Sequence, residues 1–373
     1  MRILIATDAW HPQVNGVVRT LTSLSRAAAK LGADIEFWTP DGFPSMAVPT
    51  YQSLRVALPN RREIARRIEQ AAPQAIHIAT EGPIGWAVRG YCRRNKLAFT
   101  TSYTTRFPEY VSVRTGIPAS IGYAVLRHFH GAAAMTMVAT PSLRQELSER
   151  GFKKLGFWTR GVDTELFTPN DPAKLDLPRP IFMTVGRVAV EKNLEAFLSL
   201  DLPGSKVVVG DGPQKAELER RFPKAHFLGE KTRKDLSSHM AAADVFVFPS
   251  LTDTFGVVQL ESLACGVPVA AFPVTGPLDV IADHPIGALD KDLRSACLRA
   301  LPMSRETCRA FALERSWENS ARQFIGNLSQ LQPSRLPRPS RGCDQRQPGS
   351  RLSGTERLID LLQGLRDLRW QRR

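Results

Sequence analysis

The chain has 373 residues, of which 43% are hydrophobic and 23% charged, a normal globular composition that is long enough for two domains and a tail. Its five cysteines form no CxxC motif, which argues against a disulfide framework or a zinc site and is typical of a reducing cytosol. We find no apolar run of membrane-spanning length and no signal-peptide pattern, so we expect a cytoplasmic protein.

The net charge of +14 is unevenly distributed. Residues 331–373 hold ten arginines against four acidic residues, and the proline-rich stretch 331–350 is predicted to be disordered. An amphipathic helix is predicted over 355–370, which suits an anionic membrane surface, although a solvated extension without function is the simpler alternative. A basic surface can attract nucleic acid, lipid or phosphorylated substrates, and charge alone does not choose among them.

Along the rest of the chain, short β-rich runs alternate with helical patterns such as 17–31 and 64–71. This alternation predicts parallel sheets with helices on both faces. A proline-containing linker at 168–180 then separates two doubly wound α/β domains, 1–167 and 181–330, and a last helix near 316–328 can pack back on the first domain. The predicted strands are 2–7, 35–39, 75–79, 98–102 and 135–140 in the first domain, and 181–186, 206–210, 244–248 and 267–272 in the second.

Ligands of doubly wound sheets bind beyond the carboxyl ends of the strands, so the segments after each strand are the candidate sites. After the first strand, Asn15-Gly16 allows a tight turn at a helix start whose N–H groups can hold phosphate, and His11 lies in the same segment. A turn without a ligand is an equal alternative. His77, inside an apolar strand, is better explained as a core histidine.

In the second domain, Gly186 and Arg187 follow a strand, and Lys192 lies five residues beyond Arg187. A guanidinium and an ammonium at one strand end suit a diphosphate, which takes both a fork-shaped donor and a compact cation. The alternative is an ordinary pair of exposed basic residues.

The most informative segment is 248–269, where a strand, a glycine-containing turn and a short helix carry two carboxylates. Asp253 lies in the turn, where it can meet a sugar. Glu261 lies in the helix, where it can accept two hydrogen bonds from a ribose diol. Gly256 allows backbone N–H groups to approach phosphate. Because the helix is otherwise apolar, a simple surface acid is the weaker explanation for Glu261.

Together these motifs resemble the retaining glycosyltransferases of family 4, which have the GT-B fold, over about residues 1–330. The resemblance includes the acidic pair Asp253 and Glu261, the basic pair Arg187 and Lys192, the Asn15-Gly16 loop and the RGVD sequence at 160–163. Within that family, the chain is similar to bacterial α-mannosyltransferases and sulfoquinovosyl-type lipid glycosyltransferases.

The resemblance implies a role for each matching residue. Arg187 and Lys192 would neutralise the donor diphosphate without a metal or other cofactor, Asp253 would contact the donor sugar, and Glu261 would bind the ribose. The remaining donor-binding positions would hold phosphate, sugar and base: Asn15, Gly16, Gly186, Gly229, Lys231, Thr254, Phe255, Gly256 and Val257.

One segment departs from the family pattern. Close relatives often have S-Y-H-T after the fourth strand, whereas this chain has Ser102-Tyr103-Thr104-Thr105. A threonine hydroxyl can donate a hydrogen bond but is not a useful base, so the role of the usual histidine is in doubt. We expect His11, Tyr103, Thr104 and Arg106 to contact the acceptor or sugar, with a plain surface charge as the alternative for Arg106.

The sequence therefore predicts a retaining hexosyltransferase that moves mannose or a glucose-type sugar from a GDP- or UDP-sugar to a lipid or oligosaccharide. A peripheral position on an anionic membrane is expected, and nucleic acid is not an expected partner. A non-catalytic nucleotide-sugar-binding protein and a GT-B UDP-sugar epimerase remain as alternatives.

Overall fold

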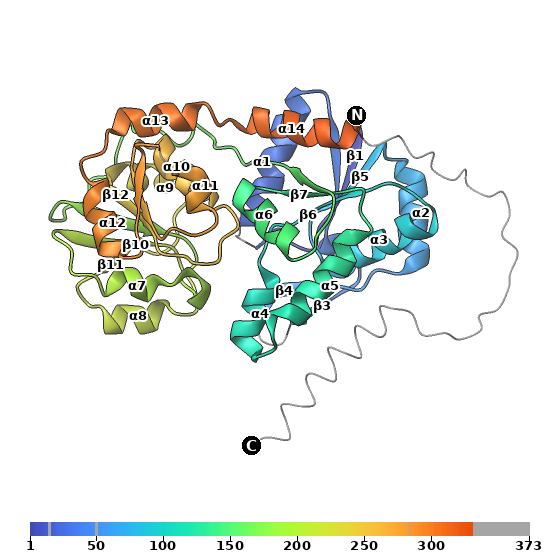
Figure 1. Cartoon of the computed structure of the whole chain (residues 1–373), viewed down its shortest axis with the longest axis horizontal. Helices are drawn as coiled ribbons and strands as arrows, with labels where there is room; N and C mark the ends of the chain where they lie inside the picture. The colour runs from blue at the N-terminus through green and yellow to red at the C-terminus, as the bar shows by residue number, and fades with distance from the viewer. Residues whose placement is uncertain (14–15, 49–50, 283, 331–373) are drawn as a thin grey trace, which may run out of the picture.

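The computed structural model describes residues 1–13, 16–48, 51–282 and 284–330, and it folds into two α/β domains that lie side by side (Figure 1). The predicted tail helix and Asn15 lie outside the described residues. Within those residues, no helix combines the length and apolar character that crossing a membrane requires.

The N-terminal domain is built on a parallel sheet that, over the described residues, has six strands in the order β2-β1-β5-β6-β7-β8. Its central strands are buried on both faces, as the apolar runs predict. The strands are β1 (Arg2–Ala6), β2 (Asp34–Trp38), β5 (Ala75–Ile78), β6 (Thr100–Ser102), β7 (Met135–Val138) and β8 (Leu155–Phe157).

Helices cover both faces of this sheet, and side-chain caps fix where some of them begin. Asn60 accepts a hydrogen bond from Arg62 N at the start of α2, and Thr140 does the same for Leu143 N at the start of α6. The remaining elements of the domain are α1 (Gly16–Lys30), η1 (Pro40–Gly42), the antiparallel hairpin of β3 (Ser45–Val48) and β4 (Tyr51–Ala57), α2 (Arg61–Ala71), α3 (Pro83–Arg94), α4 (Phe107–Thr115), α5 (Ala119–Gly131) and α6 (Pro141–Glu149).

The C-terminal domain repeats the architecture, with a parallel sheet of six strands in the described residues, in the order β11-β10-β9-β12-β13-β14. Two apolar clusters, one on each face of the sheet, form its core. Its strands are β9 (Ile181–Val185), β10 (Ser205–Val209), β11 (His226–Phe227), β12 (Val245–Phe248), β13 (Val269–Ala271) and β14 (Gly287–Leu289). Its helices are η2 (Val190–Lys192), α7 (Leu194–Leu198), α8 (Lys215–Arg221), α9 (Arg233–Ala242), α10 (Val257–Ala264), α11 (Pro277–Val280), α12 (Leu293–Ala300) and α13 (Arg305–Leu313).

The last of the described helices, α14 (Trp317–Ser329), leaves the C-terminal domain and packs against α1 of the N-terminal domain (Figure 1). The two chain segments that connect the domains meet in a β-bridge between Val162 and Ser316. Gly161 is required at this crossing, since a Cβ there would lie 2.4 Å from the backbone nitrogen of Trp317.

The prediction of a two-domain, doubly wound α/β fold is confirmed. His77 is also the core histidine that its apolar strand predicted. It is fully buried, and its ring nitrogens lie 2.8 Å from Thr100 Oγ1 and 3.2 Å from Ser102 Oγ. Burial, followed by the charge of Arg160, lowers the pKa of His77 to about 3.

Candidate active site

The loops that follow β9 and β12 lie at the carboxyl edge of the C-terminal sheet. Strand β12 is buried along its whole length and ends at Phe248, and α10 begins after Gly256. Gly256 has φ +76°, and a Cβ there would lie 2.7 Å from the Phe248 ring, so the turn needs glycine. The turn carries Asp253 and directs the first N–H groups of α10 toward the same edge.

Lys192 and Asp253 form an ion pair at this edge. Lys192 Nζ donates to both carboxylate oxygens of Asp253, at 2.8 and 2.7 Å. Burial alone would lower the pKa of Lys192, but the Asp253 carboxylate leads the opposing effects and the pKa lies above its ordinary value. Lys192 is therefore a fixed positive charge at the edge of the sheet.

Two further hydrogen bonds hold the Lys192 segment against the end of β12. Asn193 Nδ2 donates to the Pro249 carbonyl at 3.0 Å, and Ser250 Oγ donates to the Glu191 carbonyl at 3.2 Å. Asn193 adopts φ +52°, a conformation that asparagine tolerates better than most residues. These bonds place η2 beside the turn that carries Asp253.

Glu261 lies in the second turn of α10 and is 4% exposed. Its Oε2 lies 3.6 Å from Arg19 NH1 of α1, which belongs to the other domain. Within the described residues, Oε2 has no hydrogen-bond partner. Burial raises the pKa of Glu261, and Arg19 and Arg233 oppose that rise.

Other contacts also join the N-terminal domain to this edge. Thr254 Oγ1 donates to the Thr104 carbonyl at 2.9 Å, so the segment that lacks the family histidine touches the loop of Asp253. Tyr110 of α4 lies close enough to Asp253 and Lys192 to respond to their charges. Burial, followed by Asp253, raises the pKa of Tyr110.

The other donor-binding residues predicted from sequence lie at strand ends of the same sheet. Arg187 and Gly186 are exposed just beyond β9, while Gly229 and Lys231 follow β11. The exits of β9 and β10 are packed closely, because a Cβ on Gly210 would lie 1.9 Å from the Gly186 carbonyl oxygen. Phe255 and Val257 flank Gly256, Gly16 begins α1, and His11 is exposed in the loop after β1 beside Trp10.

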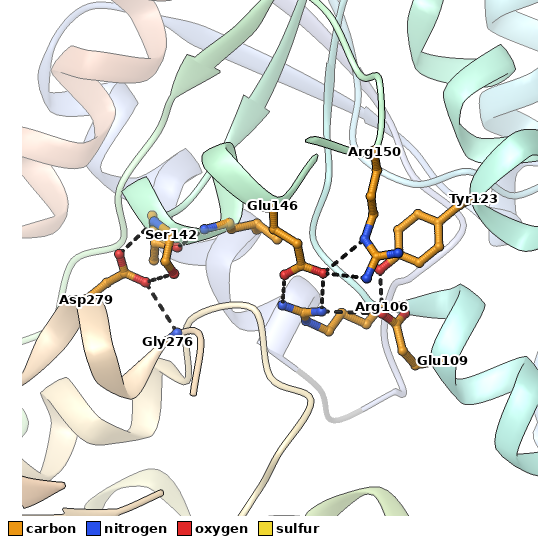
Figure 2. Close-up of polar contacts among 10 residues, drawn as sticks. Arg106, Glu109, Tyr123, Ser142, Glu146, Arg150, Gly276 and Asp279 are labelled. Carbon is orange, nitrogen blue, oxygen red and sulfur yellow. Dashed lines mark hydrogen bonds and ion pairs between the residues drawn. The ribbon is translucent and has the colours of Figure 1, made fainter. Parts of the chain in front are cut away.

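Two residues expected at the acceptor have side chains inside the N-terminal domain instead. Tyr103 is fully buried, and Arg106 is only 8% exposed. Figure 2 shows the Arg106 guanidinium facing the Glu146 carboxylate, with hydrogen bonds of 2.9 and 2.5 Å, while Glu109 lies on its other side at 3.3 Å. Arg106 is therefore not the surface charge considered above; it holds α4 against α6.

Figure 2 also shows a contact between the domains at the start of α6. Ser142 N donates to Asp279 Oδ1 at 2.9 Å, and Ser142 Oγ donates to Asp279 Oδ2. The same carboxylate accepts a hydrogen bond from Gly276 N at 3.4 Å. Asp279 of α11 thus fixes its own loop and binds the N-terminal domain.

Among the residues that the structure describes, no three His, Cys, Asp or Glu side chains converge as metal ligands would.

Comparisons with known proteins identify the family. Residues 14–166 match the family model for Glycosyltransferase Family 4, and residues 179–301 match the model for Glycosyl transferases group 1. The chain belongs to the family 4 glycosyltransferases. It has the GT-B fold and is a hexosyltransferase that uses a nucleotide-sugar donor.

Named relatives agree with this assignment. This glycosyltransferase is 27% identical to a GDP-mannose-dependent alpha-mannosyltransferase of Mycobacterium tuberculosis, over 90% of this chain and 98% of the relative. It is 30% identical to a sulfoquinovosyl transferase of Arabidopsis thaliana, over 66% of this chain and 52% of that protein. The fold resembles that of sucrose-phosphate synthase from Thermosynechococcus elongatus, with a TM-score of 0.71 and 20% identity over 88% of this chain and 98% of the other.

Sequence reasoning missed three residues that join the domains of this glycosyltransferase, and two of them, Arg19 and Tyr110, do so at the site. Arg19 lies in the first turn of α1, three residues after Gly16, and that position was a signal that could have found it. Tyr110 had no comparable signal, because α4 has no clear apolar periodicity. Asp279 pairs with Ser142 from a distant part of the chain, so no local pattern marks it.

Proposed function

We propose that this glycosyltransferase transfers mannose from GDP-mannose to a lipid acceptor with retention of the anomeric configuration and without a metal ion. The observation that carries the proposal is the Lys192–Asp253 pair at the carboxyl edge of the C-terminal sheet, where the exposed Arg187 also follows strand β9. Support for the donor comes from the mycobacterial relative, which is named for GDP-mannose and matches over nearly its whole length.

The chemistry follows from where charge develops. As the bond between the sugar C1 and the diphosphate oxygen breaks, negative charge grows on the leaving diphosphate, and the cations Lys192 and Arg187 stabilise it. The acceptor oxygen bonds to C1 on the face from which the diphosphate leaves. The acceptor proton passes to a departing phosphate oxygen, so the chain need not supply a base at Thr104.

In this proposal Asp253 serves two partners. Its carboxylate accepts two hydrogen bonds from Lys192. When the donor is bound, Asp253 accepts hydrogen bonds from the sugar hydroxyls and still orients Lys192 toward the diphosphate. Thr254 to Val257 then bring backbone N–H groups to phosphate and sugar.

The lipid acceptor and a position at the cytoplasmic surface of the membrane are supported by exposed apolar side chains of the N-terminal domain. Helices α4 and α5 pack together, and each exposes two apolar side chains one turn apart. Exposed apolar side chains beside a strongly basic chain suit a surface of anionic lipid. The four side chains are Phe107, Val111, Ile121 and Val125.

A thermal-shift screen against GDP, UDP and ADP and their sugars tests the donor. A ligand at 100 times its dissociation constant stabilises the native state by about 2.7 kcal/mol, so the preferred base is readily seen. We expect GDP and GDP-mannose to give the largest shift, with and without EDTA. NMR of the product then checks retention, and a β-linked product or a metal requirement would contradict the proposal.

Transfer assays separate this enzyme from the two alternatives. With labelled GDP-mannose and vesicles of anionic lipid, we expect label in the lipid fraction. Nucleotide binding without transfer to any acceptor would favour a non-catalytic binding protein. Inversion of the sugar nucleotide without an acceptor would favour an epimerase.

A further inference from the structure

Arg19 and Glu261 form a charge pair between the domains at the proposed ribose site. Arg19 is in the first turn of α1, its side chain is 35% exposed, and its NH1 lies 3.6 Å from Oε2 of Glu261. The Glu261 side chain is 5% exposed in α10. Since α1 and α10 belong to different domains, this pair exists only when the domains are as close as they are here (Figure 1).

An ionised carboxylate in this position needs a nearby cation. Transfer of a charge from water into a protein interior is strongly unfavourable unless the charge is paired or hydrogen-bonded. Within the described residues, Oε2 of Glu261 has no hydrogen-bond partner, and Arg19 lies at ion-pair distance from it. The lone pairs of Oε2 are thus available to a ligand that offers hydroxyl donors.

The other charged groups around Glu261 do not replace Arg19. Arg233 of α9 also favours the ionised form, but it lies 3.9 Å from Asp163, whose negative charge opposes it. Helix α13 packs against α10, and its arginines donate to carbonyls at the end of α10, at Ala264 and Cys265, rather than to Glu261. The charged groups that act on Glu261 are Arg19 from α1, Arg233 from α9 and Asp163 from the crossing segment, and the Cys265 thiol at the end of α10 lies close enough to respond to the Glu261 charge.

We propose that Arg19 is a positioning residue for donor binding, which keeps Glu261 ionised when the domains approach so that the carboxylate can accept both ribose hydroxyls. This inference rests on the proposed function, in which Glu261 binds the ribose. A protonated carboxyl group carries its own donor and accepts less well, so it cannot serve a diol equally. Separation of the domains removes Arg19 and weakens the site.

The pair therefore couples two events, the approach of the domains and the binding of the nucleotide. Coupling of this kind is reciprocal, so nucleotide binding also favours the approach of the domains. Because loss of Arg19 leaves burial less opposed, the pKa of Glu261 rises further in its absence. Nucleotide affinity is then lost at a higher pH than in the wild type.

Isothermal titration of GDP into the full chain between pH 5.5 and 8.5 tests this inference. We expect Arg19→Gln to weaken binding about tenfold at pH 7, with the acid-side loss beginning at higher pH than in the wild type. Arg19→Lys keeps the charge and should recover most of the affinity. Arg26→Gln, on an exposed arginine two turns along the same helix, is the matched control, and comparison with it at each pH cancels the titration of the diphosphate itself.

A double-mutant cycle excludes a merely structural role. Glu261→Gln should bind GDP weakly, and addition of Arg19→Gln should then cause little further loss. The inference is overturned if Arg19→Gln matches the Arg26→Gln control, or if it weakens binding equally with Glu261 and Gln at position 261. If the wild type binds no nucleotide, the proposed function fails as well, whereas a wild type that binds GDP independently of Arg19 removes only this inference.

Discussion

At the scale of single residues, the charged side chains of the site are paired with one another. Lys192 and Asp253 bind each other, while Glu261 is paired more loosely with Arg19, and its Oε2 has no hydrogen-bond partner in the part of the chain described. In the proposed function, the first pair orients groups for the diphosphate and the sugar. The second pair would leave acceptor capacity for the nucleotide, so that one edge of the protein would bind both ends of the donor.

Substitution of Lys192 should lower the rate of sugar transfer without unfolding the protein. Lys192→Ala removes the ammonium that stabilises the leaving diphosphate, and we expect kcat to fall about a hundredfold or more. Lys192→Arg keeps the charge with a different shape and should give an intermediate rate. Steady-state transfer assays measure both.

Lys224→Ala is the control for that series, because Lys224 is an exposed lysine outside the site. It should retain the wild-type rate. If Lys192→Ala also retained it, Lys192 would have no part in neutralising the diphosphate.

The buried Asp8 carboxyl group predicts a pH dependence of stability. Its carboxylate accepts hydrogen bonds from Ile84 N at 2.9 Å and from Thr80 Oγ1 at 3.1 Å, but burial dominates and raises its pKa from 3.8 to about 6. Between these values the unfolded chain releases the proton and the folded chain keeps it. The contribution of Asp8 to the free energy of unfolding is therefore full below about pH 4 and falls as pH rises to 6.

Asp8→Asn cannot ionise, so a comparison with it isolates this effect. We expect the melting temperature of the wild type relative to Asp8→Asn to be highest near pH 4 and to fall by pH 7. A difference that stayed constant or rose with pH would show that Asp8 titrates near its ordinary value.

At the scale of elements, regular strands could be predicted and long-range contacts could not. The apolar run of β1 is sufficient for its prediction, and the observed strand ends one residue before the predicted 2–7. Strands β8, β11 and β14 were missed because each is short and lies at the edge of its sheet. Strands β6 and β13 also have three residues, but they lie inside the sheets and within longer predicted runs. The position of the Arg106 side chain was predicted wrongly for a related reason. Its partner Glu146 lies 40 residues away in the sequence, so no local pattern indicates the contact.

The candidate site follows the same rule. Arg187, Lys192, Asp253 and Glu261 follow or flank predicted strands, so their common edge was predictable. Their partners from the other domain were not, because which face of α1 or α4 meets the C-terminal domain depends on how the two domains pack.

The contact between α6 and α11 should control how readily the domains separate. Asp279→Ala removes the carboxylate that binds both Ser142 N and Ser142 Oγ, and we expect KM for the donor to rise several-fold with a smaller change in kcat. Small-angle scattering should show a larger radius of gyration without nucleotide.

Ser142→Ala removes only the hydroxyl contact between the domains and leaves the Gly276 contact of Asp279 in place. It should therefore also raise KM for the donor, but by a smaller factor than Asp279→Ala. Ser304→Ala, which removes the cap of α13 within one domain, is the control. Equal KM values in Ser142→Ala and Ser304→Ala, with no change in Asp279→Ala, would contradict a role in domain closure.

At the scale of the whole molecule, α14 ties the C-terminal end of the described chain to the core of the other domain. Phe324 is fully buried, and its ring centroid lies 4.9 Å from that of His77 and 4.8 Å from that of Trp158. Trp158 Nε1 also donates to Ser320 Oγ at 3.1 Å. The N-terminal core is therefore completed by a helix at the C-terminal end of the described residues.

Phe324→Ala should consequently destabilise the N-terminal domain, although residue 324 follows the C-terminal domain in sequence. Removal of a buried phenylalanine costs about 3–5 kcal/mol, and the cavity would lie beside His77 and Trp158. In thermal unfolding we expect the transition that includes the N-terminal domain to move to lower temperature, while the C-terminal domain keeps its stability. Nucleotide binding should also weaken, because the surface of α1 that faces the C-terminal domain is disturbed. Leu313→Ala, at an exposed position of α13, should leave both transitions in place. A loss confined to the C-terminal domain in Phe324→Ala would mean that α14 does not belong to the core of the N-terminal domain in solution.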